Sequence, residues 1–424
     1  MDVINFENSG EILRIADNLE TQPVMGWLSA SGCITKKDIK VKDVLQNIRK
    51  NYIKILENYP TLRIKLITKN NFPYWVYASN EEIQFDNLIK IVDEPLIDDV
   101  PVCYDASIAP LWRVSLSQIQ EKIKIKVIAS HAITDGRSIF DLFNLFASYG
   151  LNRELNENLK KAMNQPVLYE FGKKDWFTKE IIDRGIDNSF FKDIHIENIG
   201  LNPPVELPSH VINPQWDVKY APISKFCKKY KCSPQAILMA IQNESIRVYH
   251  EGKYDDILIP IYIPVDNRNS KYATELFKKS LFFSHVGIVI VFMEPEEDWL
   301  KNIEKCYEQL KIQLNTTRSC DDSYFSSNMR NYETGELKFP ENYPNPNTYV
   351  FASHLGLVGE GYENIQFKSY SPVLEGMYWP NLYGYHNKEI FSFMWNGPYN
   401  CPEKFFSLIK ETSLKYYNLI LNDI

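Results

Sequence analysis

Apolar residues repeat with two different periods in the first third of the chain. From Asp43 to Asn58 they recur every three or four residues, which predicts an amphipathic helix that ends at Tyr59-Pro60. Alternation with a period of two follows and predicts strands. The alternating segments are Leu62 to Ile67, Tyr74 to Tyr77, Trp112 to Leu116 and Ile123 to Val127. We expect these strands to pair in a sheet that has one covered face.

The last of these strands has two different faces. Ile123, Ile125, Val127 and Ala129 share one face, and Lys122, Lys124 and Lys126 share the other. The alternation brings His131 to the apolar, buried side. Ser138 is predicted to be the N-cap of a helix, with Asp141 three residues later as in a capping box. The residues from His131 to Arg137 are therefore predicted to form a strand-to-helix loop.

The periodicity weakens between residues 151 and 210, where four prolines occur, and we place a domain boundary there. The predicted halves are residues 1–180 and 181–424. Helices are predicted at Ser233 to His250, Asp298 to Leu314 and Cys401 to Leu421, and strands at Ile257 to Pro264, Leu281 to Phe292, Tyr349 to Ser353 and Ile390 to Trp395. A chain of 424 residues is longer than a domain with a single hydrophobic core usually is. We therefore expect two halves, each with an α+β architecture.

Composition and charge exclude several classes of protein. Hydrophobic residues make up 44% of the chain, and the net charge of -7 comes from interspersed charges without a basic block, which disfavours nucleic acid as a partner. The most apolar stretch is too short to cross a bilayer, and the N-terminus does not resemble a secretory signal, so we expect a cytoplasmic protein. The seven scattered cysteines contain no CxxC spacing, so reduced thiols and no metal site are expected.

The segment from Ser130 to Ser138 carries the pattern HxxxDG. A histidine at the end of a buried strand can keep one ring nitrogen available, and its pKa near neutrality suits a general base. Gly136 allows the chain to turn without a side chain in the way. Asp135 needs a partner if it is buried. The motif alone is short enough to arise by chance, and a structural histidine is the alternative interpretation.

Four further segments accompany this motif in a recognisable order. In chain order the five segments are Asn58 to Arg63, Pro110 to Leu116, His131 to Ser138, Ile263 to Arg268 and Ala352 to Gly356. Together they resemble the superfamily of chloramphenicol acetyltransferase, alcohol acetyltransferases, plant BAHD acyltransferases and nonribosomal-peptide condensation domains. The motif is most similar to the alcohol acetyltransferase version. Ser130 replaces the first histidine of the condensation-domain motif, the plant DFGWG motif is absent, and His354 replaces the asparagine of an SNxG strand.

The resemblance implies two chloramphenicol-acetyltransferase-like mixed-sheet domains with an active-site tunnel between them. It implies that His131 and Asp135 are the catalytic residues, with His131 as the general base. Gly136 and Arg268 would give structural support, with Arg268 as the ion-pair partner of Asp135. A local contact with Arg137 and a solvated Asp135 carboxylate are the alternatives. Ser353 is the candidate donor to the oxyanion.

The resemblance also implies the substrates. Acyl-CoA, with acetyl-CoA as the first candidate, is the expected co-substrate, no bound cofactor is expected, and the acceptor is a small alcohol or amine. We expect a monomer. Two alternatives stay open, namely a non-catalytic binding protein on the same fold and a carrier-protein-dependent condensation-type enzyme. A Ser-His-Asp hydrolase is disfavoured because the chain has no GxSxG elbow.

Overall fold

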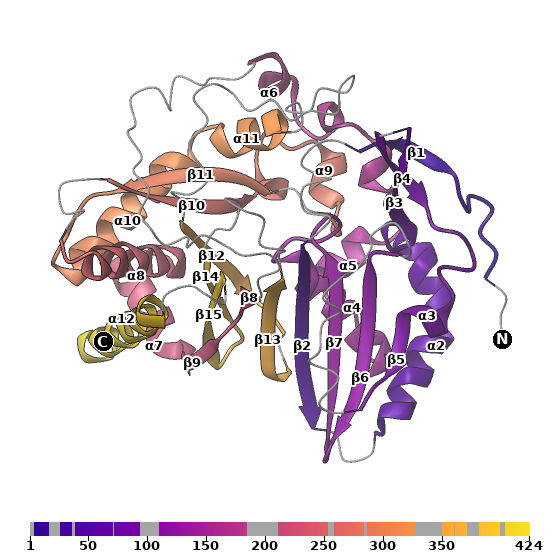
Figure 1. The fold of residues 1–424 in the computed structure, drawn as a ribbon, viewed down its shortest axis with the longest axis horizontal. Coiled ribbons are helices and arrows are strands. Elements are labelled where there is room, and N and C mark those ends of the chain that lie inside the picture. The colour runs from indigo at the N-terminus through magenta and orange to yellow at the C-terminus, as the bar shows by residue number, and fades with distance from the viewer. Residues whose placement is uncertain are drawn as a thin grey trace.

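The computed structural model describes residues 4–16, 26–35, 39–70, 72–93, 110–184, 211–252, 258–283, 286–326, 350–359, 361–370, 381–398 and 403–424. Two large sheets lie side by side, and helices cover them on the outside (Figure 1). This arrangement is a mixed α+β architecture, as the sequence predicted.

The first large sheet has five strands in the order β13-β2-β7-β6-β5. They are β2 (Trp27–Thr35), β5 (Ile89–Ile91), β6 (Trp112–Ile119), β7 (Lys122–Ser130) and β13 (Glu363–Tyr370). Helices α2 (Val41–Asn58) and α4 (Ser138–Gly150) pack together against it. Because β13 comes from the second predicted half and pairs with β2, the late part of the chain completes this early sheet.

The second large sheet has the order β11-β10-β12-β14-β15-β8, and β9 also pairs with β15. Its strands are β8 (Val211–Ile212), β9 (Gln215–Lys219), β10 (Ile259–Asp266), β11 (Val286–Met293), β12 (Val350–Leu357), β14 (Asn381–His386) and β15 (Ile390–Pro398). The sheet is mixed, since β12 runs parallel to both β10 and β14. Helices α8 (Pro234–Tyr249), α10 (Trp299–Leu314) and α12 (Glu403–Asp423) pack against one another beside it.

Smaller elements complete the described chain. A three-stranded sheet joins β1 (Ile12–Ile15), β4 (Phe72–Tyr77) and β3 (Ile64–Lys69). The remaining helices are α3 (Phe85–Leu88), α5 (Glu157–Ala162), α6 (Lys179–Arg184), α7 (Tyr220–Tyr230), α9 (Glu275–Lys279) and α11 (Arg318–Ser326). The long amphipathic helices and the strands β4, β6 and β7 confirm the predictions from periodicity.

Three local predictions need correction. Helix α4 begins at Ser138 itself, so the N-cap is Arg137 and the expected capping box is absent. The strand expected from Leu281 begins at Val286, because residues 281–283 are irregular where they pack beside Arg268. Lys124 and Lys126 are buried, so the second face of β7 is also covered; the long apolar stems of lysine make such burial feasible. Ile257, Tyr349 and Cys401 lie outside the described residues.

Candidate active site

The turn that follows β7 fixes the backbone of His131. The carbonyl oxygen of Ser130 accepts hydrogen bonds from the Ile133 N–H (3.1 Å) and the Thr134 hydroxyl (3.0 Å). The hydroxyl oxygen of Ser130 accepts one from the Ala132 N–H (3.2 Å). The His131 N–H donates to the Gly26 carbonyl at 2.7 Å. Ser130, which replaces the first histidine of the condensation-domain motif, is fully buried and holds this turn.

The His131 side chain lines a cavity and is only partly exposed. Burial lowers the pKa of His131 below its ordinary value of 6.5, and the negative charge of Asp135 opposes this shift. The imidazole is therefore neutral at pH 7. A neutral imidazole can accept a proton, which is the protonation state that a general base requires.

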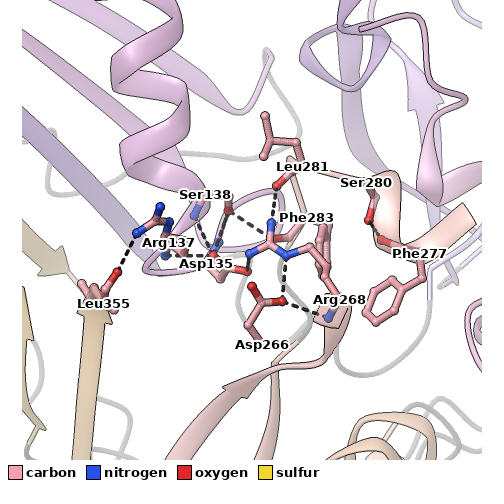
Figure 2. Close-up of polar contacts among 10 residues, drawn as sticks. All are labelled: Asp135, Arg137, Ser138, Asp266, Arg268, Phe277, Ser280, Leu281, Phe283 and Leu355. Atoms are coloured by element: carbon pink, nitrogen blue, oxygen red, sulfur yellow. Dashed lines mark hydrogen bonds and ion pairs between the residues drawn. The ribbon is translucent and has the colours of Figure 1, made fainter. Parts of the chain in front are cut away.

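Asp135 holds the start of α4 through its carboxylate (Figure 2). Oδ1 accepts hydrogen bonds from the Arg137 N–H at 2.9 Å, the Ser138 N–H at 2.7 Å and the Ser138 hydroxyl at 3.0 Å. The Asp135 N–H donates to the hydroxyl oxygen of Ser138 at 2.8 Å. A carboxylate is favourable here because the first N–H groups of a helix have no partner within the helix. Asp135 therefore accepts the hydrogen bonds of the first N–H groups of α4, which is the capping role that the sequence predicted for Ser138.

The second oxygen of Asp135 faces Arg268, which lies just after β10. Oδ2 of Asp135 lies 3.6 Å from Nη2 of Arg268, so the structure contains the long-range ion pair. Arg268 has further partners, because its Nε donates to Asp266 Oδ1 at 2.7 Å and its Nη1 to the Leu281 carbonyl at 3.1 Å. Its guanidinium group also lies over the ring of Phe283. Figure 2 shows how this cluster joins the loop before α4 to the second sheet.

Arg137 and Gly136 form a second connection between the sheets. Nη1 of Arg137 donates to the carbonyl oxygens of Leu355 (3.0 Å) and Leu357 (2.6 Å) on β12. A Cβ atom on Gly136 would lie 2.7 Å from Cδ2 of Leu355. The sequence assigned Gly136 to a turn, but the structure shows that close packing against β12 also requires a residue without a side chain.

A cavity of about 750 Å³ lies between the two sheets. All five predicted site residues line it, although they are spread over more than half of the chain: His131, Asp135, Gly136, Arg268 and Ser353. The loop after β7, the turn just after β10 and the strand β12 supply them. Tyr383 of β14 also lines the cavity, whereas Tyr385, Phe391 and Trp395 belong to the cores.

Solved structures share the overall fold of this chain, although no protein-family model and no curated protein matches the sequence. The epimerization domain from the third module of tyrocidine synthetase B is 12% identical and matches over 99% of both chains with a TM-score of 0.65. TRI101 of F. sporotrichioides, solved with coenzyme A and T-2, is 12% identical over 94% of this chain and 96% of its own, with a TM-score of 0.61. The chain has the chloramphenicol-acetyltransferase-like fold.

Another structure with this fold is the starter condensation domain of rhizomide synthetase, solved with C8-CoA and Leu-SNAC. It is 9% identical over 95% of this chain and 94% of its own, with a TM-score of 0.64. The condensation domain, the epimerization domain and TRI101 thus share the chloramphenicol-acetyltransferase-like fold with this chain. The fold alone does not select one of these branches.

Two further residues of the cavity, Asp141 and His354, were not predicted to belong to the site. Asp141 in the first turn of α4 is only 2% exposed, and burial raises its pKa to about 6. His354 on β12 stacks on His386 with ring centroids 5.5 Å apart, and burial lowers its pKa to about 3. Nε2 of His354 is buried and has no hydrogen-bond partner in the structure as described. The helical spacing gave Asp141 a capping role, and only the tertiary structure reveals its place in the cavity.

The remaining features concern metals and membranes. No group of three or more His, Cys, Asp or Glu residues within the described ranges could hold a metal ion. None of the helices that the structure describes is long and apolar enough to cross a membrane.

Proposed function

We propose that this protein is an acyl-CoA-dependent acyltransferase that moves an acyl group from a thioester to a small alcohol or amine. The observation that carries this proposal is the convergence of His131, Asp135, Gly136, Arg268 and Ser353 on one cavity between the two sheets. The fold is shared with an acetyltransferase and with condensation domains, which supports acyl-transfer chemistry.

His131 acts as the general base in the proposed reaction. Its neutral imidazole takes the proton from the acceptor O–H or N–H as the oxygen or nitrogen attacks the thioester carbonyl carbon. The tetrahedral intermediate then collapses, the carbon–sulfur bond breaks, and the imidazolium returns the proton to the thiolate. A base in this position contributes about 10²- to 10⁴-fold to the rate. No covalent acyl-enzyme is required.

The remaining cavity residues position the base and bind charge. Ser353 is the proposed donor to the oxyanion, and loss of such a donor costs about 3 kcal/mol of transition-state stabilisation. Asp135 and Arg268 hold the loop that carries His131, while Gly136 allows β12 to approach it. Lys161, Lys278 and Lys279 also line the cavity, and their positive charge suits the phosphate groups of coenzyme A. Acetyl-CoA is the first donor to test.

The decisive experiment measures free-thiol release from acetyl-CoA and longer acyl-CoAs with a panel of alcohols and amines. Acceptor-dependent release should disappear in His131→Ala and persist in the matched control His250→Ala, because His250 lies at the end of α8 and does not line the cavity. Ser353→Ala should lower kcat with little change in acyl-CoA binding.

Other outcomes would point to the alternatives. Tight acyl-CoA binding without release for any acceptor would favour a binding protein on this fold. Acyl transfer only from a thioester attached to a carrier protein would favour a condensation-type enzyme. Equal rates for wild type and His131→Ala would exclude His131 as the base.

A further inference from the structure

The first turn of α4 places a carboxyl group in the cavity that the proposed acyl transfer does not use. Asp141 is 2% exposed, and it lines the same cavity as His131. The expected capping role is absent, since the Asp135 carboxylate accepts the N–H groups of Arg137 and Ser138. A buried carboxyl group normally has a hydrogen-bond or ion-pair partner. For the Asp141 carboxyl, the described residues supply neither.

The charged groups nearest to Asp141 are already engaged elsewhere. Its pKa responds to Arg137, Arg268, Asp135 and Asp266. The Arg137 guanidinium donates to two carbonyl groups of β12, and the Arg268 guanidinium faces Asp266, Asp135 and the Leu281 carbonyl. The cluster thus contains three carboxyl groups, those of Asp135, Asp141 and Asp266, and two guanidinium groups. When all three carboxyl groups are ionised, the negative charges outnumber the positive ones by one. The cluster therefore has one negative charge without a matching cation.

Burial is the main reason why the pKa of Asp141 rises to about 6. The guanidinium groups of Arg137 and Arg268 oppose this rise, and the two neighbouring carboxylates add to it. At neutral pH the carboxylate is thus ionised in a place that penalises its charge. A cation that enters the cavity would relieve this penalty. A ligand that carries a protonated amino group has the charge and the hydrogen-bond donors that a carboxylate accepts most strongly.

We propose that Asp141 is a specificity-determining residue that binds an ammonium group of the acceptor. The acceptor class is then an amino alcohol or a diamine. One end, a hydroxyl or a neutral amine, is the nucleophile at His131, and the other end is protonated and bound by Asp141. This inference rests on the proposed acyl transfer at the same cavity, and it names the acceptor class that the transfer would use.

The test uses straight-chain amino alcohols and alkanols of matched length as probes of the full-length protein. Calorimetry without any acyl donor measures binding, and thiol release from acetyl-CoA measures kcat/KM. For the best chain length, we expect wild type to prefer the amino alcohol about tenfold or more in both assays. Asp141→Asn should abolish this preference. The control Asp183→Asn removes the same charge from an exposed position on α6 and should retain the preference.

The two assays separate the inference from the function on which it rests. Acyl transfer with equal kcat/KM for amino alcohols and alkanols would overturn the inference and leave the acyltransferase intact. Amine binding that depends on Asp141, without thiol release from any acyl-CoA, would overturn the proposed acyltransferase function. The proposal that Asp141 binds an ammonium group would still hold. Amine binding that is equally strong in wild type and Asp141→Asn would assign the amine to another site and overturn the inference.

Discussion

The two carboxylates beside Arg268 differ in burial as well as in distance. Asp266 lies 2.7 Å from the guanidinium group but its side chain is 34% exposed, whereas Asp135 lies 3.6 Å away and its side chain is 3% exposed. Because water reaches the partly exposed Asp266 carboxylate and screens this pair, Asp266→Asn should lower the free energy of unfolding by about 1 kcal/mol or less. Asp135→Asn leaves a buried cation without its buried partner, so a loss of about 3 kcal/mol is expected.

Urea unfolding followed by tryptophan fluorescence compares the two variants. The asparagine oxygen at position 135 can still accept the hydrogen bonds that Ser138 and the Arg137 N–H donate to Asp135, so the comparison isolates the charge. A change in midpoint without a change in the slope m reports stability directly. If Asp266→Asn proved at least as destabilising as Asp135→Asn, the shorter distance, and not the deeper burial, would decide which ion pair in this cluster contributes more to stability.

Three further predictions concern the same cavity. The acid limb of log kcat/KM for acyl transfer should have its midpoint below pH 6.5, because burial lowers the pKa of His131 and the base works only when neutral; a midpoint above 6.5 would contradict this. Gly136→Ala should lower stability by about 1–3 kcal/mol, and a double-mutant cycle in urea should show a smaller loss in the Leu355→Ala background, where the 2.7 Å clash is absent. Asp141→Asn should raise the free energy of unfolding by about 3 kcal/mol at pH 8. The reason is that the folded-state pKa of Asp141 rises from 3.8 to about 6, which penalises the ionised native state above pH 6; in urea titrations the gain should vanish below pH 4, where the carboxyl is protonated in both states.

Local patterns in the sequence determined a large part of this protein. The period of the apolar residues located α2, α8 and α10. This is possible because the residues of a buried helical face recur every three or four positions within a short stretch of sequence. The HxxxDG segment located the loop between β7 and α4. The order of the family-like segments indicated the fold, and the solved structures bear out that prediction.

Only the tertiary structure decided which distant residues meet. Strand β13 joins the first sheet because its edge pairs with β2, and no local pattern encodes a pairing between residues so far apart in the chain. The role of Gly136 depends on the position of Leu355. Asp135 holds the start of α4 in place of Asp141, and within the described part of the chain the Asp141 carboxyl has no hydrogen-bond or ion-pair partner. Periodicity specifies which face of an element is buried, but the contacts made by that face depend on how the elements pack.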